Sequence, residues 1–131
     1  MKTAIVQFPG GTGASDLFYA LKNMLDQKVE VVWHEDFEPS GYDLIILPGG
    51  SSYSDYLRPG AIASTTDAAS SIVKFAEAGG FVIGIANGFS ILCEAGLLPG
   101  VLLRNKCLKY ICNNIYIKPD NNYSVVNQAV K

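Results

Sequence analysis

Hydrophobic residues come in short blocks along the first 95 positions, and most blocks stop at a turn-forming residue. The blocks at 3–8, 29–33, 44–47 and 81–85 are short and mostly apolar, as strands are. The block at 44–47 reads Leu-Ile-Ile-Leu and stops at Pro-Gly-Gly. Such a continuous apolar block favours a strand that is covered on both faces of a parallel sheet. We expect the block at 81–85 to be buried in the same way.

Between these blocks the apolar residues recur at helical spacing. One helix is expected from Ser15, which is a good N-cap residue, with Asp16 near the positive end of the helix dipole. Its apolar face is made of Leu17, Ala20, Leu21, Met24 and Leu25. A second helix is predicted to begin near 65–67 and to end at Gly79, and a third to span 87–95. The alternation predicts an α/β domain with a parallel sheet and right-handed crossovers.

Beyond Gly100 the pattern changes. Short apolar pieces at 101–103, 109–112 and 115–117 indicate further strands, antiparallel to one another. Residues 120–122 are predicted to form a turn, and residues 123–131 to pair with a neighbour or to fray.

Composition narrows the class of protein. A chain of 131 residues fits one domain, and 49% hydrophobic residues exclude a disordered tail. A net charge of −2 argues against a nucleic-acid binder. No apolar run reaches the roughly 18 residues of a membrane span, and the start lacks a signal-peptide stretch, so we expect a cytoplasmic domain.

Charge is distributed unevenly along the chain. Residues 1–94 carry 11 acids and 5 bases, whereas residues 95–131 carry 1 acid and 5 bases. The tail would therefore suit an acidic partner or a phosphate, or simply present solvated lysines.

Cysteine and histidine are too sparse for a metal site. The three cysteines, Cys93, Cys107 and Cys112, have no C-x-x-C spacing, and His34 is the only histidine. We expect buried or incidental thiols, no disulfide framework, no metal and no cofactor.

Glycine-rich loops follow three of the predicted strands, at the edge where ligands bind in open α/β sheets. The first, Gly10-Gly11-Thr12-Gly13-Ala14-Ser15, precedes a helix and would suit a phosphate, but it lacks the P-loop lysine and the G-x-G-x-x-G spacing. The second, at 48–52, frees backbone N–H groups that can stabilise an oxyanion. In the segment that follows, residues 54–60, polar side chains would line the same edge, or Asp55 and Arg58 would simply form a surface pair.

The third loop has the spacing of a nucleophile elbow. Gly84-Ile85-Ala86-Asn87-Gly88 places small residues around a sharp strand-to-helix turn. The central residue is alanine, whose methyl group cannot attack a carbonyl. From these residues alone the segment is a tight turn without chemistry.

Together these loops resemble a known family. The segments L-P-G-G at 47–50, Y-S-D-Y-L-R-P-G-A-I-A at 53–63, G-I-A-N-G-F at 84–89 and E-A-G-L-L-P-G at 94–100 are similar to the glutaminase subunit of phosphoribosylformylglycinamidine synthase. F-P-G at 8–10 and R-N-K at 104–106 match its pattern too. That subunit is a class I glutamine amidotransferase of purine biosynthesis, and the resemblance covers most of residues 1–113.

The resemblance implies a flavodoxin-like three-layer sandwich with a mostly parallel sheet. In the family a cysteine at the elbow forms a glutamyl thioester and releases ammonia to a synthetase partner that uses ATP. Ala86 stands where that cysteine belongs. Gly50 and Asn87 fall where the oxyanion hole is expected, with Gly49 beside them, and Ser90 stands where a glutamine helps to hold the substrate.

Several departures from the family bear on activity. The nucleophile is replaced at Ala86, the substrate-holding glutamine is Ser90, and the first loop lacks the usual S-N-C-D. In the family, a His-x-Glu pair that acts as the base lies in a later part of the chain, beyond the position that corresponds to Lys131. We therefore expect residues 1–131 to form a single domain that is incomplete at its C-terminus. We hypothesise a domain of glutaminase ancestry that does not hydrolyse glutamine.

Three interpretations stay open. The chain is a binding or scaffold subunit that engages a synthetase, an inactivated Cys-to-Ala form of a true glutaminase, or a small-molecule binder that uses residues 10–15. An unpaired sheet edge would also invite association, so we expect a homo-oligomer.

Overall fold

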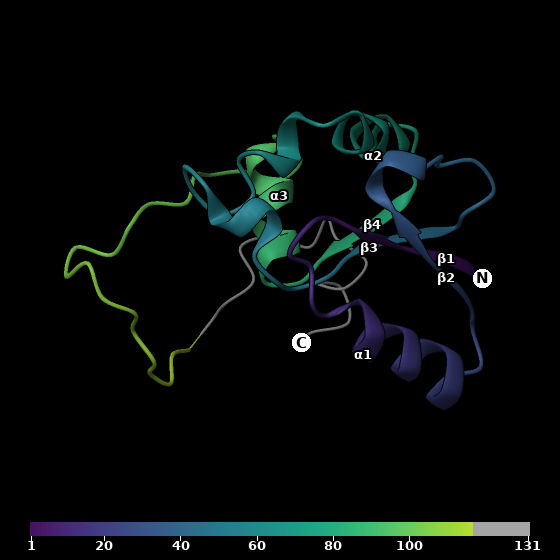
Figure 1. Cartoon of the computed structure of the whole chain (residues 1–131), viewed down its shortest axis with the longest axis horizontal. Helices are drawn as coiled ribbons and strands as arrows, with labels where there is room; N and C mark the ends of the chain where they lie inside the picture. Colours follow the sequence, from purple (N-terminus) through teal and green to yellow (C-terminus); the bar gives the residue numbers. More distant parts are fainter. Residues whose placement is uncertain (117–131) are drawn as a thin grey trace.

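A four-stranded parallel sheet forms the centre of the molecule. The computed structural model describes residues 1–116 of the chain. Strands β1 (Lys2–Gln7), β2 (Lys28–Trp33), β3 (Leu44–Leu47) and β4 (Phe81–Gly84) lie in the order β2-β1-β3-β4 and are all parallel (Figure 1). The predicted α/β class with a parallel sheet is confirmed.

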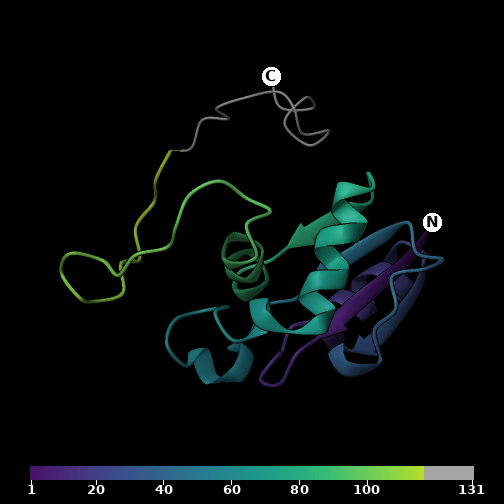
Figure 2. The ribbon, with the colours of Figure 1, turned by 90° about the horizontal axis from the view of Figure 1, so that it is seen from above.

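Helices cover both faces of this sheet and make three layers. Helix α1 (Ala14–Tyr19) lies on one face and continues as a π-helix over Ala20–Met24, whereas α2 (Asp67–Glu77) and α3 (Asn87–Glu94) lie on the other (Figures 1 and 2). Short 3₁₀ turns occur at His34–Asp36, Ser52–Asp55 and Ala63–Thr65. Over residues 1–116 no helix is long and apolar enough to cross a membrane.

The core is deepest around the two central strands. Strand β3 is buried along its whole length, as its continuous apolar pattern predicts, and Ile45 and Leu47 are fully enclosed. On the α1 face, Ile5, Val29 and Ile46 pack against the helix side chains. The opposite face is filled by a larger cluster with contributions from α2 and α3, which includes Ile72, Ile91 and Leu92. Burial of this kind contributes about 25 cal/mol per Å² of apolar surface.

Strand β4 is not buried, and the prediction for it was wrong. Phe81 is 58% exposed and Ile83 42% exposed, although their partners in the β3 register, Leu44 and Ile46, are buried. Helix α1 contacts β1 and β2 but does not cover this part of the same face. A continuous apolar block has the same pattern in a central strand and in an edge strand whose outer face has no cover.

The first helix differs from its predicted form at both ends. Gly13, not Ser15, is the N-cap, and no side chain caps the helix. Leu17 and Leu21 pack against the sheet as predicted, but Met24 and Leu25 are 72% and 60% exposed. The cause is the change to π-helical hydrogen bonding, in which the Leu25 N–H donates to the Ala20 carbonyl at 3.1 Å and rotates the last turn away from the sheet.

The second helix begins where the sequence predicts. The Thr66 hydroxyl accepts a hydrogen bond from the Ala69 N–H at 3.3 Å, which is an N-cap contact. The helix ends two residues before Gly79, which adopts φ +92°.

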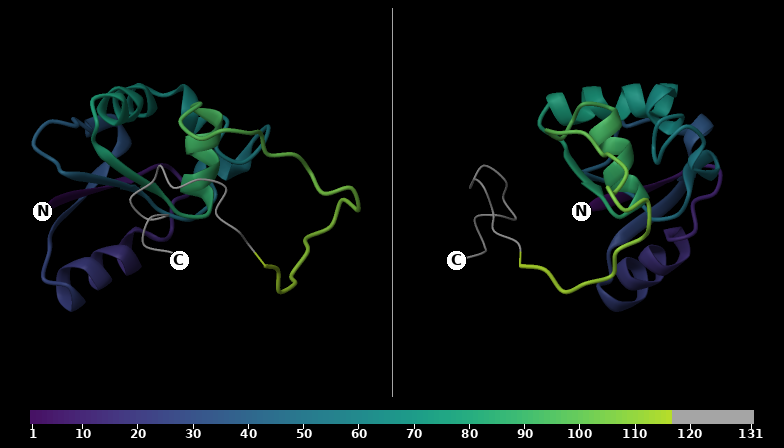
Figure 3. Two further views of the ribbon diagram at one scale, coloured as in Figure 1. Left: turned by 180° about the vertical axis from the view of Figure 1, so that it is seen from behind. Right: turned by 90° about the vertical axis from the view of Figure 1, so that its left-hand side faces the viewer.

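Residues 101–116 form no strand, contrary to the prediction. They make an extended arm that leaves the end of α3 and contains one short turn (Figure 3). A short apolar piece becomes a strand only when a neighbouring strand offers hydrogen-bond partners, and the arm lies away from the sheet. The predictions for residue 117, for the turn at 120–122 and for 123–131 lie outside the described residues.

Candidate functional site

Loops after β1 and β3 lock together at the carboxyl edge of the sheet. The N–H groups of Thr12 and Gly13 donate to the Gly49 carbonyl at 3.1 and 3.0 Å, and the Ser51 N–H donates to the Gly10 carbonyl at 3.0 Å. Both loops lie at this edge of the sheet, as the sequence predicts. Their contact also changes the expected role of residues 10–15, because two of the N–H groups that would bind a phosphate support Gly49 instead.

Glycine is required where these two loops touch. Gly50 adopts φ +145°, and a Cβ atom there would lie 2.6 Å from the Gly10 carbonyl oxygen. Gly10 has φ +82°, and its Cβ would lie 2.2 Å from the Ser51 oxygen. No side chain fits at either contact, so the close approach of the two backbones explains both glycines.

The turn between β4 and α3 has a strained backbone centred on Ala86. This alanine adopts φ 51° and ψ −107°, a conformation that costs an L-residue about 1–3 kcal/mol. Glycines on either side permit the turn: a Cβ atom on Gly84 would lie 2.7 Å from the Gly88 carbonyl carbon. Such strain usually accompanies a side chain that must be displayed, yet here it displays a methyl group.

Ala86 lies directly beside the β3 loop. A Cβ atom built on Gly49 would come 3.5 Å from the Ala86 Cβ. Within residues 1–116, neither the Gly50 N–H nor the Asn87 N–H donates a hydrogen bond to a protein acceptor. The Asn87 N–H also belongs to the first turn of α3, where the helix dipole favours negative charge. The two N–H groups are free to bind an oxygen that carries partial negative charge.

The side chain of Asn87 clasps the β3 loop. Its Oδ1 accepts a hydrogen bond from the Ser52 N–H at 3.1 Å, and its Nδ2 donates to Asp55 Oδ1 at 2.9 Å. Asn87 is only 8% exposed, so these contacts replace water at a buried amide. Sequence reasoning assigned Asn87 a backbone role and missed this clasp, because nothing in the local spacing links residues 52 and 55 to residue 87.

The clasped loop is itself strained. Tyr53, Ser54 and Asp55 all have positive φ angles, of 51°, 57° and 53°. The Tyr53 N–H donates to the Pro9 carbonyl at 2.8 Å, and the Tyr53 hydroxyl lies 3.2 Å from His34 Nε2. Contacts from three directions therefore hold a backbone that would otherwise relax.

His34 is a structural residue in this arrangement. Its ring is 8% exposed and stacks on Phe8 with centroids 5.1 Å apart. Its Nε2 is engaged with Tyr53, whose own pKa is raised by burial and by the nearby Glu35 carboxylate. These contacts tie His34 to the support of the β3 loop.

Arg58 pairs with Glu94, not with Asp55, so the expected surface pair was wrong. The guanidinium donates to both carboxylate oxygens of Glu94, from Nε and from one terminal nitrogen, at 2.6 Å each. Asp55 is instead taken by Asn87. The bidentate pair joins the segment after β3 to the last turn of α3, and the hydrogen bonds from Arg58 lower the pKa of Glu94.

This pair makes stability depend on acid pH. The pKa of Glu94 is lower in the folded state than in the unfolded state. The ion pair therefore adds to the free energy of unfolding at any pH above the unfolded-state pKa of Glu94, and this stabilisation is lost as the pH falls through the folded-state pKa. We expect Arg58→Gln to lower the melting temperature near pH 7 and to have less effect well below pH 4. Thermal unfolding of wild type and variant across this range is the test, and a pH-independent difference would contradict it.

Ser90 turns toward the helix backbone. The side chain is 8% exposed, and its Oγ donates to the Ala86 carbonyl at 3.5 Å. The hydroxyl is therefore close to the elbow but is occupied within α3.

No group of three or more His, Cys, Asp or Glu side chains within residues 1–116 is placed to hold an ion. The cysteines are free thiols, with Cys93 half-buried and Cys107 and Cys112 exposed on the arm.

Comparison with known proteins decides the family. The sequence profile of the CobB/CobQ-like glutamine amidotransferase domain matches residues 1–131. The chain belongs to this family. It is 51% identical over 122 residues to phosphoribosylformylglycinamidine synthase subunit PurQ of Moorella thermoacetica, covering 93% of this chain and 52% of the relative. It is 50% identical to PurQ of Alkaliphilus metalliredigens, covering 100% of this chain and 58% of that protein.

A solved structure agrees with this family membership. The structure of PurLQS from Thermotoga maritima contains a chain that matches 86% of this one with a TM-score of 0.77 and 45% identity. The match covers 52% of that chain. The chain thus spans about half the length of the curated relatives it matches, and it is a homologue of the glutaminase subunit of purine biosynthesis. The resemblance drawn from the loop motifs is confirmed.

Proposed function

We propose that this chain is a PurQ-type domain that binds glutamine without hydrolysing it and serves as a binding or scaffold subunit. The observation that carries this proposal is Ala86, a methyl group at the centre of a strained elbow that is otherwise intact. Family chemistry needs a thiolate at this position, which attacks the glutamine amide and expels ammonia. A methyl carbon has no lone pair with which to begin that reaction.

The backbone groups that would bind glutamine are better preserved than the side chain that would react with it. The free N–H groups of Gly50 and Asn87 are suited to receive the carbonyl oxygen of an amide. The loops that present them are held by the contacts between Gly49 and residues 12–13 and by the Asn87 clasp. These contacts support a site that recognises glutamine and does not turn it over.

A free histidine that could act as the catalytic base is also missing from residues 1–116. His34 is the only histidine in the 131-residue sequence, and it is stacked on Phe8 and engaged with Tyr53. A cysteine nucleophile works with a base that is oriented toward it. We therefore expect that placing cysteine at position 86 alone leaves this chain without glutaminase activity.

The proposed partner is a synthetase subunit that uses ATP. The structure of PurLQS contains a matching chain, which supports a role beside a synthetase. In this role the chain would position or regulate the partner and would not supply ammonia from its own elbow. The expected setting is the cytoplasm.

A second candidate is an inactivated form of a true glutaminase, in which cysteine has been changed to alanine. The backbone at Ala86 favours this candidate. Its φ of 51° is strained, and an alanine side chain offers no chemistry that would require this conformation. Ser90, in place of the substrate-holding glutamine, argues against a single change. The two candidates differ in one result: cysteine at position 86 restores turnover only in the second.

The phosphate-binding candidate, which uses residues 10–15, has fewer free N–H groups than the sequence alone suggests. The N–H groups of Gly11, Thr12 and Gly13 all donate to backbone carbonyls, of Phe8 in the first case and of Gly49 in the other two. These three groups are therefore not available to a phosphate, which leaves the N–H groups at the start of α1 as the ones that could bind it.

Calorimetric titration with glutamine tests the proposal. We expect the wild-type chain to bind glutamine, and Ala86→Leu to weaken binding at least about tenfold, because a larger side chain fills the space beside Gly49. Met24→Ala, at an exposed position remote from these loops, is the control and should bind normally. Absence of wild-type binding, or equal binding by all three proteins, would remove the support for a glutamine site.

A further inference from the structure

A cavity lies at the carboxyl edge of the sheet, on the side that α2 covers. Its walls come from the 3₁₀ turn His34–Asp36, from Tyr53 in the β3 loop and from the first turn of α2. The 3₁₀ turn packs beside α2 (Figure 1). The cavity has a volume of about 550 Å³. Pockets of roughly 300–1,000 Å³ are the size that holds a small ligand.

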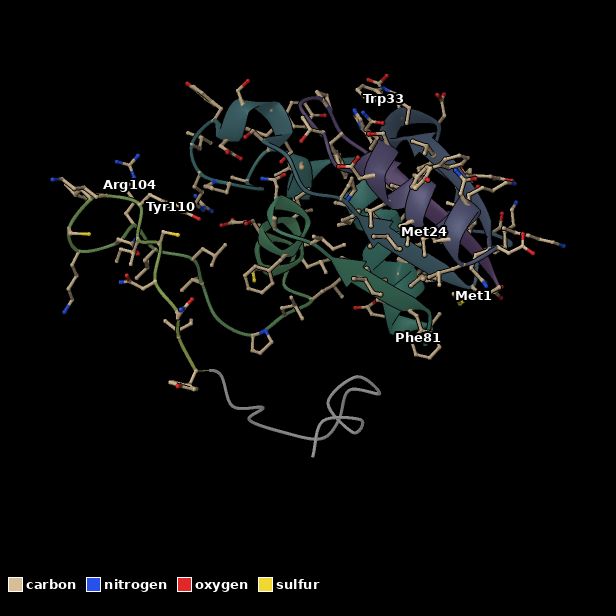
Figure 4. All side chains as sticks on the ribbon, turned by 90° about the horizontal axis from the view of Figure 1, so that it is seen from below. Met1, Met24, Trp33, Phe81, Arg104 and Tyr110 are labelled. Carbon is tan, nitrogen blue, oxygen red and sulfur yellow. The ribbon has the colours of Figure 1, made fainter. Side chains whose placement is uncertain are left out.

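Three carboxylates line this cavity without a cation to balance them. They belong to Glu35, Glu38 and Asp67, and the lining contains no lysine or arginine. The ion pairs within residues 1–116 use other acids. Figure 4 shows Arg104 extending from the arm, well away from Trp33, which ends β2 at this edge. A cleft lined by charge of one sign attracts ligands of the opposite sign.

The ring of His34 adds a polar group that still needs a partner. It is 8% exposed, Phe8 stacks on it, and its Nε2 is engaged with the Tyr53 hydroxyl at 3.2 Å. Its Nδ1 has no hydrogen-bond partner among residues 1–116, and it is not sealed from solvent. The ring lines the cavity, so we place the open Nδ1 on it. A largely buried nitrogen of this kind calls for a hydrogen bond.

We propose that this cavity binds an organic cation that carries a guanidinium group. No three His, Cys, Asp or Glu side chains within residues 1–116 are grouped closely enough to hold a metal ion. The three carboxylates are therefore spread around the cavity, and they match an extended cation better than a point charge.

Guanidinium fits the lining in three respects. It is planar, it offers only N–H donors, and it stacks on aromatic rings. The carboxylates of Glu38 and Asp67 accept such donors, and the Tyr53 ring supplies an aromatic surface. With its proton on Nε2, the His34 ring donates to the Tyr53 oxygen and its Nδ1 accepts from the ligand.

Titration with agmatine, followed by ¹H–¹⁵N NMR of the wild-type chain, tests this proposal. Agmatine carries a guanidinium at one end and an ammonium at the other. We expect saturable shifts of the Asp67 and Ala68 amides, which belong to the lining. Asp67→Asn and Glu38→Gln should each weaken binding by about threefold or more. Glu77→Gln, at the far end of α2, removes the same charge from an exposed site and should bind as wild type does.

Three outcomes would overturn the proposal. The first is the absence of saturable shifts in wild type. The second is equal weakening by Glu38→Gln and Glu77→Gln, which would show attraction to net charge alone. The third is equal affinity for putrescine, which has ammonium groups at both ends and would remove the reason for a guanidinium. If Asp67→Asn fails to fold, Glu38→Gln carries the comparison, because Glu38 is exposed. The titration contains no glutamine, so its result is independent of the proposed function.

Discussion

Gly88→Ala is expected to unfold the domain, or to lower its free energy of unfolding by about 3 kcal/mol or more. A Cβ atom on Gly88 would lie 2.1 Å from the Leu47 carbonyl oxygen and 2.7 Å from its carbonyl carbon. Both atoms belong to the backbone of the buried central strand β3, so neither can move without opening the contact between α3 and the sheet. The elbow at Ala86 and the free N–H of Asn87 would move with the helix.

Urea denaturation of Gly88→Ala beside Gly96→Ala separates steric overlap from backbone strain. Gly96 has φ +77° but open space around it, so its substitution should cost only about 1 kcal/mol. Equal costs at the two positions would show that α3 does not pack as closely on β3 as the structure has it.

Asn87→Ala is expected to cost about 2–3 kcal/mol of folding free energy. The substitution removes both halves of the clasp and leaves the buried Ser52 N–H without its acceptor. The strained backbone at 53–55 would lose one of its supports, so the loop that presents Gly50 should relax as well. Asn105→Ala, on the arm, is the matched control and should lie within about 0.5 kcal/mol of wild type, because Asn105 is exposed.

Asn87→Asp separates the two halves of this clasp. The new carboxylate still accepts from the Ser52 N–H, but it faces the Asp55 carboxylate where an amide donated before. Two carboxylates at hydrogen-bond distance raise the pKa of one of them in the folded state, so the variant should recover stability as pH falls. Urea denaturation at pH 5 and pH 8 measures this. A variant that is no more stable at pH 5 would contradict the Asn87–Asp55 contact.

The parallel α/β core was predictable because its signals are local. The Leu-Ile-Ile-Leu block and the turn residues after it specify β3, and Thr66 marks the start of α2. Burial of β4 was not predictable, since the apolar block at 81–84 does not record whether a neighbour covers it. The prediction of strands in the arm was wrong for a related reason: the short apolar pieces at 101–116 do not show whether a partner strand lies beside them.

The site was predictable in its backbone and not in its side chains. Glycine spacing located the loop at 49–50 and the elbow at Ala86, because close backbone approach demands glycine. The clasp from Asn87 to Asp55 and the ion pair from Arg58 to Glu94 join residues more than 30 positions apart. Such contacts depend on how α3 packs against the β3 loop. The spacing of residues along the sequence gives no information about this packing.

Ammonia release from glutamine by the purified chain, measured with a coupled glutamate dehydrogenase assay, tests the loss of glutaminase chemistry most directly. For the wild-type chain and for Ala86→Cys we expect steady rates equal to those without protein, because the methyl group cannot attack and His34 is committed to Tyr53. Turnover by Ala86→Cys alone would identify the chain as an inactivated glutaminase that retains its base. Steady ammonia release by the wild-type chain would contradict the assignment of a non-hydrolysing domain altogether.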